Sequence, residues 1–324
     1  MALLAGKARS LFCRMPAAPL LRPGLLLLLL ANLASLAHSA TTADKELSLF
    51  EQRALYQQAL DDLRRGAVSK FRAKAKRLDN YPLRPYLDYH LVNGRLNRAS
   101  AKEIRNFMDE HSDLAPSDIM FRRWLKKLGQ KRHWTTLLQN FSDADYQRSR
   151  DAELRCYYVR ALYGREQRKK ALDWTTDLWL SPKSQPKACD PIFDVWRTTP
   201  RFTEEIAWQR FDAAIKNNQR KLSRYLLRFF TGTNKRAAEA YYQVHTQPKR
   251  VTKRSRFARD NAQNRSIIQH GLMRLSRNGA KDAAKAWAGY AETHSFSPVQ
   301  RSIIAEHIQV GLARDGTFPS AAER

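Results

Sequence analysis

The sequence is poor in the residues that interrupt helices. Its 324 residues include only 12 glycines and 13 prolines, whereas Leu, Ala, Arg, Lys and Gln, which favour helices, are abundant. No stretch of alternating residues rich in Val, Ile and Thr is present, and no Asn-Gly or Asp-Gly turn joins two such stretches. These absences argue against a β-sandwich or barrel, and we expect an all-α protein.

Motifs for metal binding and catalysis are also absent. The eight histidines form no HExxH or His-x3-His pattern, and the sequence has no Cys-x2-Cys, GxSxG or phosphate-cradling glycine loop. We therefore expect no metal, no cofactor and no catalytic residue in this chain. Pairs of acidic residues are expected to be solvated or to cap helices, namely Glu204 with Glu205 after Thr203, Asp61 with Asp62, and Asp143 with Asp145.

Residues 1–40 have the pattern of a secretory signal peptide. Four basic residues precede the apolar run GLLLLLLANLASLA, and small residues follow it. Cleavage after Ala37, Ser39 or Ala40 fits this pattern, and an uncleaved signal anchor is the alternative. Cys13 lies before the apolar run, so it is not a lipidation cysteine. No second apolar stretch approaches spanning length, and we expect an exported chain without a membrane anchor after cleavage.

Export decides how the remaining cysteines are interpreted. Removal of residues 1–40 takes away Cys13 and four basic residues, so the net charge of +27 falls by four to +23. Cys156 and Cys189 are left in an oxidising compartment, where cysteine pairs form disulfides. A disulfide between them is expected, with two buried free thiols as the alternative.

Apolar residues recur at helical spacing from Leu47 onward, in short stripes separated by breaks. Ser100 and Glu103 form a capping pattern at a helix start, and Gly129 and Gly164 are interpreted as helix ends. Pairs of helices, for example 153–163 with 167–180, occupy about 30 to 35 residues each, the length of an α-solenoid unit. Because these units share no consensus, we expect a solenoid of irregular helix pairs.

Three tryptophans surround the segment between the cysteines. Trp174, Trp179 and Trp196 could form a platform for sugar rings, since aromatic faces stack on glycans. Trp174 and Trp179 are at helical spacing with Leu172, however, and core packing is the favoured interpretation.

The basic surplus predicts an affinity for polyanions. Segments such as FRRWLKKLGQKR and PKRVTKRSRFAR place Lys and Arg on the solvent side of helices and in a loop. Inside a cell this would indicate nucleic acid. Export makes nucleic acid a poor candidate, and the acidic stem peptides of the cell wall or an anionic membrane surface fit better. A merely solvated basic face is the alternative.

Three segments resemble a known family. YPLRPYLDYHLV (81–92), RCYYVRALYGR (155–165) and above all ALDWTTDLWLSPKSQPKACDPIFDVWRTT (171–199) are similar to the soluble lytic murein transglycosylases, and the resemblance extends over about residues 45–315. It implies a right-handed α-superhelix, the U-shaped domain of that family, occupying residues 41–324. It also implies a disulfide at Cys156 and Cys189 and a periplasmic location.

The resemblance further implies an activity on peptidoglycan. Members of the family cleave the MurNAc-GlcNAc β-1,4 bond and leave a 1,6-anhydro end, using one glutamic acid in a Glu-Ser motif of a lysozyme-like domain. The 324 residues contain no Glu-Ser dipeptide, so we expect a superhelical part truncated on its C-terminal side and inactive by itself. A separate catalytic domain or self-association is the expected partner, and a stand-alone basic peptidoglycan-binding or scaffold module is the alternative.

Overall fold

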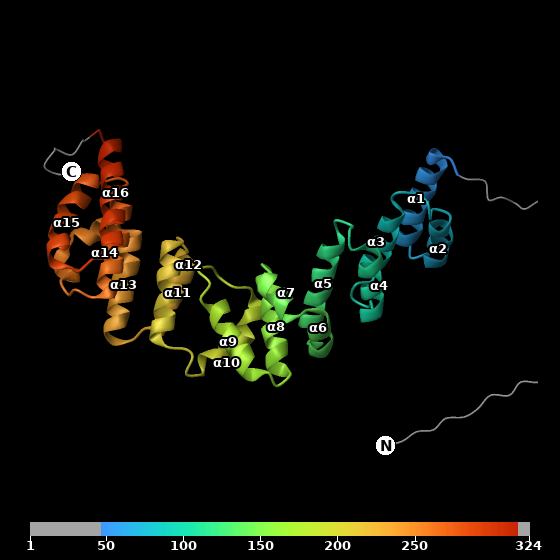
Figure 1. Ribbon diagram of the computed structural model, residues 1–324, viewed down its shortest axis with the longest axis horizontal. Helices are drawn as coiled ribbons and strands as arrows, with labels where there is room; N and C mark the ends of the chain where they lie inside the picture. The colour runs from blue at the N-terminus through green and yellow to red at the C-terminus, as the bar shows by residue number, and fades with distance from the viewer. Residues whose placement is uncertain (1–46, 317–324) are drawn as a thin grey trace, which may run out of the picture. The chain divides into compact units, whose positions relative to one another are not determined.

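The computed structural model describes residues 47–316, and these contain helices and no strand (Figure 1). The segment interpreted as a signal peptide, with Cys13, lies outside the described residues. The first seven helices are α1 (Leu49–Arg64), α2 (Val68–Lys76), α3 (Arg84–Gly94), α4 (Ala101–His111), α5 (Ser117–Gln130), α6 (Trp134–Asn140) and α7 (Asp143–Arg148). The prediction of an all-α protein is confirmed.

The middle of the chain contains the cysteines and tryptophans. Its elements are α8 (Ala152–Gly164), α9 (Arg168–Trp179), the 3-10 turn η1 (Lys187–Cys189), α10 (Asp190–Arg197), α11 (Glu204–Lys216), α12 (Arg220–Leu226) and η2 (Leu227–Phe229). The remaining elements are α13 (Gly232–Thr246), η3 (Pro248–Thr252), η4 (Arg254–Phe257), α14 (Ala262–Leu275), α15 (Ala280–Thr293) and α16 (Pro298–Arg314). The helix pair predicted at 153–163 and 167–180 corresponds to α8 and α9 within one residue at each end.

Contacts between helices are mostly between neighbours in sequence. Helix α8 packs against α9, which lies beside it in Figure 1, and also against α5 and α6; further along, α14 packs against α13, α15 and α16. The chain divides after Glu51, and the compact unit from Gln52 onward contains nearly all described residues. In the preceding unit, the amide and hydroxyl of Ser48 donate to the Glu51 carboxylate. A buried apolar cluster runs from Val92 to Leu312, as expected of a solenoid in which each pair covers its neighbours.

Side-chain caps begin several helices where the sequence predicts them. The Ser100 hydroxyl accepts from the Glu103 amide at the start of α4. Thr203 accepts from the Ile206 amide at the start of α11, so the expected helix start after Thr203 is confirmed. These caps satisfy amide groups that the helix itself leaves without partners.

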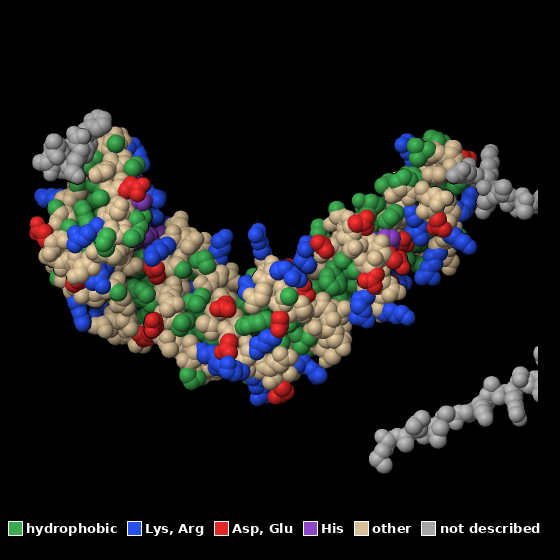
Figure 2. Space-filling view, in the orientation of Figure 1, with side chains coloured by type: hydrophobic (Ala, Val, Ile, Leu, Met, Phe, Trp, Pro, Cys, Tyr) green, Lys and Arg blue, Asp and Glu red, His purple; other side chains and the backbone are tan. Residues whose placement is uncertain are grey.

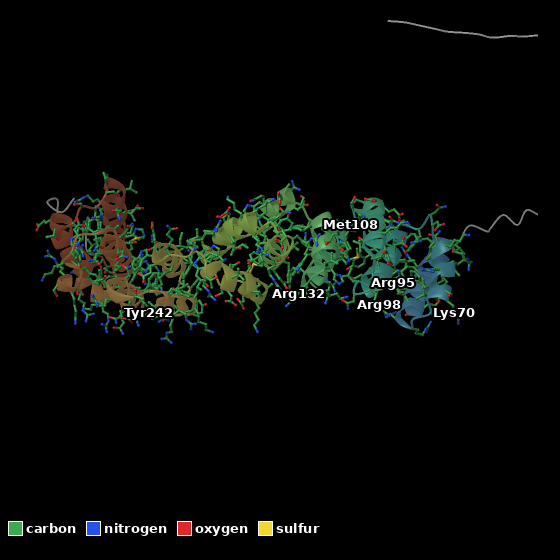
Figure 3. The ribbon with its side chains drawn as sticks, turned by 90° about the horizontal axis from the view of Figure 1, so that it is seen from below. Lys70, Arg95, Arg98, Met108, Arg132 and Tyr242 are labelled. Atoms are coloured by element: carbon green, nitrogen blue, oxygen red, sulfur yellow. A yellow bond between two sulfur atoms is a disulfide. The ribbon has the colours of Figure 1, made fainter. Side chains whose placement is uncertain are left out.

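Four helices are followed by the same type of backbone turn, although the residues in these turns share no sequence consensus. The residues after α1, α5, α8 and α11 adopt a left-handed conformation, with φ of 76° at Gly66, 58° at Arg132, 66° at Glu166 and 56° at Asn218. At each, the next amide donates to the carbonyl five residues back, for example His133 to Leu128 at 2.9 Å. This is the bond of a Schellman motif. Figure 3 labels Arg132 at one of these turns.

The expectation that a helix ends at Gly129 is wrong, because α5 continues through it to Gln130. A Cβ on Gly129 would meet the ring of Tyr157 on α8. Gly129 therefore permits two helices to approach closely. The helix ends at Gln130, and the left-handed residue of the turn after it is Arg132. Among residues 47–316, no helix combines the length and apolar character needed to cross a membrane.

Candidate functional site

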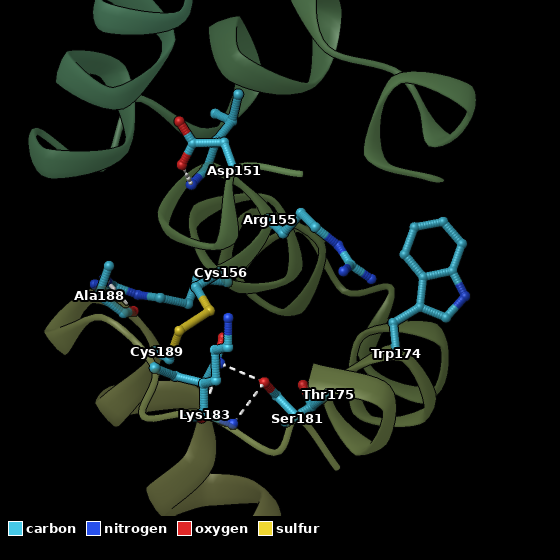
Figure 4. The surroundings of a disulfide bond; sticks show 12 residues. Asp151, Arg155, Cys156, Trp174, Thr175, Ser181, Lys183, Ala188 and Cys189 are labelled. Atoms are coloured by element: carbon cyan, nitrogen blue, oxygen red, sulfur yellow. Dashed lines mark hydrogen bonds between the residues drawn. A yellow bond between two sulfur atoms is a disulfide. The ribbon is translucent and has the colours of Figure 1, made fainter. Parts of the chain in front are cut away.

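The two cysteines expected to pair form a disulfide in the structure. The Sγ atoms of Cys156 on α8 and Cys189 on η1 are 1.98 Å apart, and the Cα atoms are 4.9 Å apart (Figure 4). Both cysteines are fully buried. The bond closes a 33-residue separation and joins α8 to the segment that leads into α10.

The loop between α9 and η1 is held by further polar contacts. The Gln185 side-chain amide donates to the Ser181 hydroxyl at 2.8 Å and to the Lys183 carbonyl at 3.1 Å. Arg160 of α8 donates to the carbonyl of Ala188, next to the disulfide, at 3.2 Å. The Gln185 bonds order the loop internally, and Arg160 and the disulfide attach its C-terminal end to α8; Figure 4 shows Ser181 and Lys183 beside Cys189.

This loop forms one side of a pocket of about 510 Å³. The volume lies within the range of small-molecule sites in proteins. Helices α10, α11 and α12 form the other sides. The apolar part of the wall consists of Trp179, Phe193 and Leu222, and the charged part consists of Asp190, Asp194, Arg197, Arg210 and Lys221, with Ser184, Gln185 and Tyr225 completing it.

Arg210 is the unusual member of this pocket. Its side chain comes from α11 and is only 3% exposed. The guanidinium lies 4.3 Å from the centre of the Trp179 ring, and its Nη2 donates to the Lys183 carbonyl at 3.4 Å. The Nε atom is buried without a hydrogen-bond partner, and none of the ion pairs among the described residues includes Arg210. Burial lowers the pKa of Arg210 to about 10.

The neighbouring cations have different surroundings. Arg197 of α10 forms an ion pair with Asp194 and donates to the Tyr225 hydroxyl at 3.0 Å. Lys221 of α12 is exposed at the pocket. The charges of Arg197 and Asp194 therefore offset each other. The buried charge of Arg210 is left without a counterion in the described part of the chain.

The tryptophans behave as the core interpretation predicts. Trp179 and Trp196 are buried, and the Trp196 indole N–H donates to the Thr176 hydroxyl at 3.0 Å. Trp174 stacks on Tyr146 with ring centres 4.4 Å apart, and the Lys170 ammonium lies 4.8 Å from the centre of its ring. Trp179 and Trp196 are core residues, although Trp179 lines the pocket. Trp174 packs on the core from one side, is half-buried, and lines a second pocket beside Lys170 and Asp173.

The acidic pairs form more ion pairs and hydrogen bonds than the sequence suggests. Asp62 was expected to be solvated or capping, but it is buried and forms ion pairs with Lys74 and Arg65. Hydrogen bonds from those two cations lower its pKa. The prediction is wrong here because Lys74 comes from α2, which folds back beside α1. This contact is between helices and leaves no mark in local sequence.

Two other acidic pairs have structural roles. Asp143 accepts from the Tyr158 hydroxyl at 2.7 Å and pairs with Lys170, while Asp145 completes a capping box with Ser142. The Glu204 carboxylate accepts from the amide of Thr231, 2.9 Å away, ahead of α13. None of these carboxylates lines the Arg210 pocket. Residues 47–316 also contain no group of three or more His, Cys, Asp and Glu side chains that could hold a metal ion.

Sequence reasoning did not identify the pocket. Its cations, Arg197, Arg210 and Lys221, come from three successive helices and follow no fixed spacing. In a chain with 58 Lys and Arg residues, one buried arginine has no distinctive signature. The only indication in the sequence is that Arg210 follows the 171–199 segment closely.

No family model matches the chain. The chain is similar to a curated relative, the soluble lytic murein transglycosylase of Escherichia coli K12. The two are 27% identical over 265 residues, which are 80% of this chain and 40% of that protein. Among solved structures, the fold is similar to an inactive mutant of the lytic transglycosylase Slt from Pseudomonas aeruginosa. That match has 30% identity and a TM-score of 0.69, and it covers 81% of this chain and 42% of that one.

A second solved structure, a complex of the 70-kDa soluble lytic transglycosylase with bulgecin A, has the same fold. Its TM-score is 0.71 at 23% identity, and the match covers 86% of this chain and 44% of that one. The predicted superhelix is confirmed by these neighbours. The chain is homologous to soluble lytic murein transglycosylase over the N-terminal superhelical region of that enzyme. It spans about 40% of the length of the curated relatives that it matches.

Proposed function

We propose that this chain is the superhelical part of a periplasmic lytic transglycosylase and that it contacts peptidoglycan during cell-wall turnover. In this proposal residues 1–40 are a signal peptide and residues 41–324 are the superhelical domain. The cleavage of MurNAc-GlcNAc bonds to 1,6-anhydro products requires a catalytic domain in addition to these residues. Family-level similarity to lytic transglycosylases supports this proposal.

One observation carries the proposal more than any other. Homology and a shared fold extend over four fifths of this chain, with 30% identity to the enzyme from Pseudomonas aeruginosa. The 171–199 segment, on which the resemblance depends most, surrounds the disulfide and contributes to the Arg210 pocket. The surface charge is compatible with an acidic polymer, because Lys and Arg outnumber Asp and Glu on the face shown in Figure 2.

The proposal is tested with purified chain and isolated peptidoglycan sacculi. We expect the chain to co-sediment with sacculi and to release no 1,6-anhydro-muropeptides, with a full-length lytic transglycosylase as the positive control. Release of anhydro products by the chain alone would contradict the proposed lack of a catalytic residue. Absence of any co-sedimentation at low salt would contradict the proposed contact with peptidoglycan.

A salt titration in the same assay separates the alternative. Binding that weakens steeply with salt is expected of a basic surface that supports a catalytic domain. Binding that persists at moderate salt would favour a stand-alone peptidoglycan-binding module.

A further inference from the structure

The pocket beside the loop between α9 and η1 contains a buried cation, Arg210. No described residue forms an ion pair with it. Transfer of an isolated guanidinium from water to a protein interior is costly unless it is paired and hydrogen-bonded. The contact of Arg210 with Trp179 and one long hydrogen bond to Lys183 offset part of this cost. The Nε atom has no hydrogen-bond partner within residues 47–316. Arg210 lines the pocket, and an anion that entered it would balance this charge.

The surroundings indicate which anion fits. Asp190 lines the same pocket and forms no ion pair among the described residues, whereas Asp194 is paired with Arg197. The charge of Asp190 opposes a phosphate dianion more strongly than an anion with a single charge. A carboxylate carries a single charge and matches the fork of a guanidinium. Trp179, Phe193 and Leu222 supply apolar wall for small side chains next to that carboxylate. The combination favours a short peptide with a free carboxyl group over an inorganic anion.

Two features keep the site ready for such a ligand. The Cys156–Cys189 disulfide and the hydrogen bonds of Gln185 fix the loop that contributes Ser184 and Gln185 to the pocket. Asp190 makes no ion pair among the described residues, so its carboxylate can accept from N–H groups of a bound peptide. Lys221 lies at the exposed side of the pocket, where it attracts anions.

We propose that this pocket binds a carboxylate of the peptidoglycan stem peptide, with the Arg210 guanidinium as its counterion. That the ligand is a stem peptide rests on the proposed function. That the ligand carries a carboxylate rests on the pocket alone. It gives the superhelical part a specific contact with the peptide portion of the polymer, in addition to its general basic charge.

The test compares wild type with Arg210→Met in titration calorimetry. The probes are a muropeptide with a stem peptide, the same muropeptide with its carboxyl groups amidated, the disaccharide without peptide, and N-acetyl-alanyl-alanine. We expect wild type to bind the first and last probes and to bind the amidated and peptide-free probes much more weakly. Arg210→Met should lower the affinity for the carboxylate probes about tenfold or more, because a charge-assisted hydrogen bond is lost.

Arg224→Met is the matched control. Arg224 is exposed on α12 and does not line the pocket, so this variant removes the same charge and should bind like wild type. Thermal unfolding of Arg210→Met shows whether it is folded. Removal of an unpaired buried charge should leave its melting temperature unchanged or higher. If this variant does not fold, Lys221→Met serves as the second variant and should weaken carboxylate binding, because Lys221 is the exposed cation of the pocket.

Outcomes of the two proposals are distinguishable. Equal binding of amidated and free peptides, or equal binding by wild type and Arg210→Met, would overturn the pocket assignment even if the chain sediments with sacculi. Binding of N-acetyl-alanyl-alanine that depends on Arg210, without any binding to sacculi, would support the carboxylate site and contradict the proposed function.

Discussion

Gly129 of α5 lies directly against the aromatic ring of Tyr157 on α8. A Cβ built on Gly129 would fall 2.2 Å from Cγ of that ring, which is much closer than van der Waals contact. Tyr157 is itself buried and cannot withdraw into solvent without exposing its ring. The distance between α5 and α8 is therefore set by the absence of a side chain at residue 129.

Gly129→Ala is expected to destabilise the protein despite the higher helix propensity of alanine. Propensity favours alanine by about 1 kcal/mol, but overpacking of a core typically costs about 1 to 3 kcal/mol. We expect a net loss in the free energy of unfolding in urea. Gly94→Ala is the control, because Gly94 ends α3 with no atom within 4 Å of a Cβ. That variant should be neutral or more stable, and equal effects of the two substitutions would show that packing against Tyr157 does not matter.

Glu166→Gly is expected to stabilise the turn after α8. Glu166 has a φ of 66°, a left-handed conformation that costs a residue with a Cβ about 1 kcal/mol or more. Glycine adopts it without that cost, so the free energy of unfolding should rise by about 1 kcal/mol at most. Arg165→Gly is the adjacent control, since Arg165 has a φ of −114° and glycine there only loosens the unfolded chain. If both substitutions raised the free energy of unfolding, the stabilisation by Glu166→Gly would not come from the positive φ of residue 166.

Removal of the disulfide is expected to destabilise the chain strongly. In the chain-entropy model, a cross-link that closes a 33-residue separation contributes about 3 to 4 kcal/mol. The double variant Cys156→Ala, Cys189→Ala should show this loss in urea unfolding under oxidising conditions. Wild type treated with a reductant should approach the variant, and the variant should not respond to the reductant. If wild type and variant unfold alike without reductant, the bond has no such role.

Stability is also expected to fall on mild acidification because of a histidine pair in which His245 is buried and His270 is partly buried. The His245 Nδ1 and His270 Nε2 atoms are 3.1 Å apart. Burial, together with Arg274 near both rings, lowers the pKa of His245 to about 4 and that of His270 to about 3. The unfolded chain takes up protons near pH 6.5, whereas the folded chain does not until the pH is much lower.

The free energy of unfolding should therefore decrease as the pH falls from about 6.5 toward about 4, with a slope of up to about 1.4 kcal/mol per pH unit for each histidine. Cations that face the pair, Arg220, Arg274 and Arg277 with Lys216, act in the same direction. His270→Gln should make the decrease shallower, and His90→Gln, at an exposed position on α3, should not. The same slope in wild type and His270→Gln would contradict this account.

The sequence by itself determined the helical class, many helix boundaries and the burial of Trp179 and Trp196 in the core. Apolar stripes, caps such as Ser100 and Thr203, and the scarcity of glycine and proline are local signals, and local hydrogen bonds decide where a helix begins. The pairing of Cys156 with Cys189 was also expected, because only these two cysteines follow the predicted signal peptide.

Only the tertiary structure decided what Gly129, Asp62 and Arg210 do. Gly129 faces Tyr157, and Asp62 meets Lys74. Arg210 is enclosed by a loop about 25 residues earlier in the chain, where it reaches the carbonyl of Lys183. In each case the partner comes from another element, so the contact depends on how helices pack rather than on the neighbouring sequence. Burial converts an ordinary arginine among many into a charge that needs a counterion, and burial is a property of the folded chain alone.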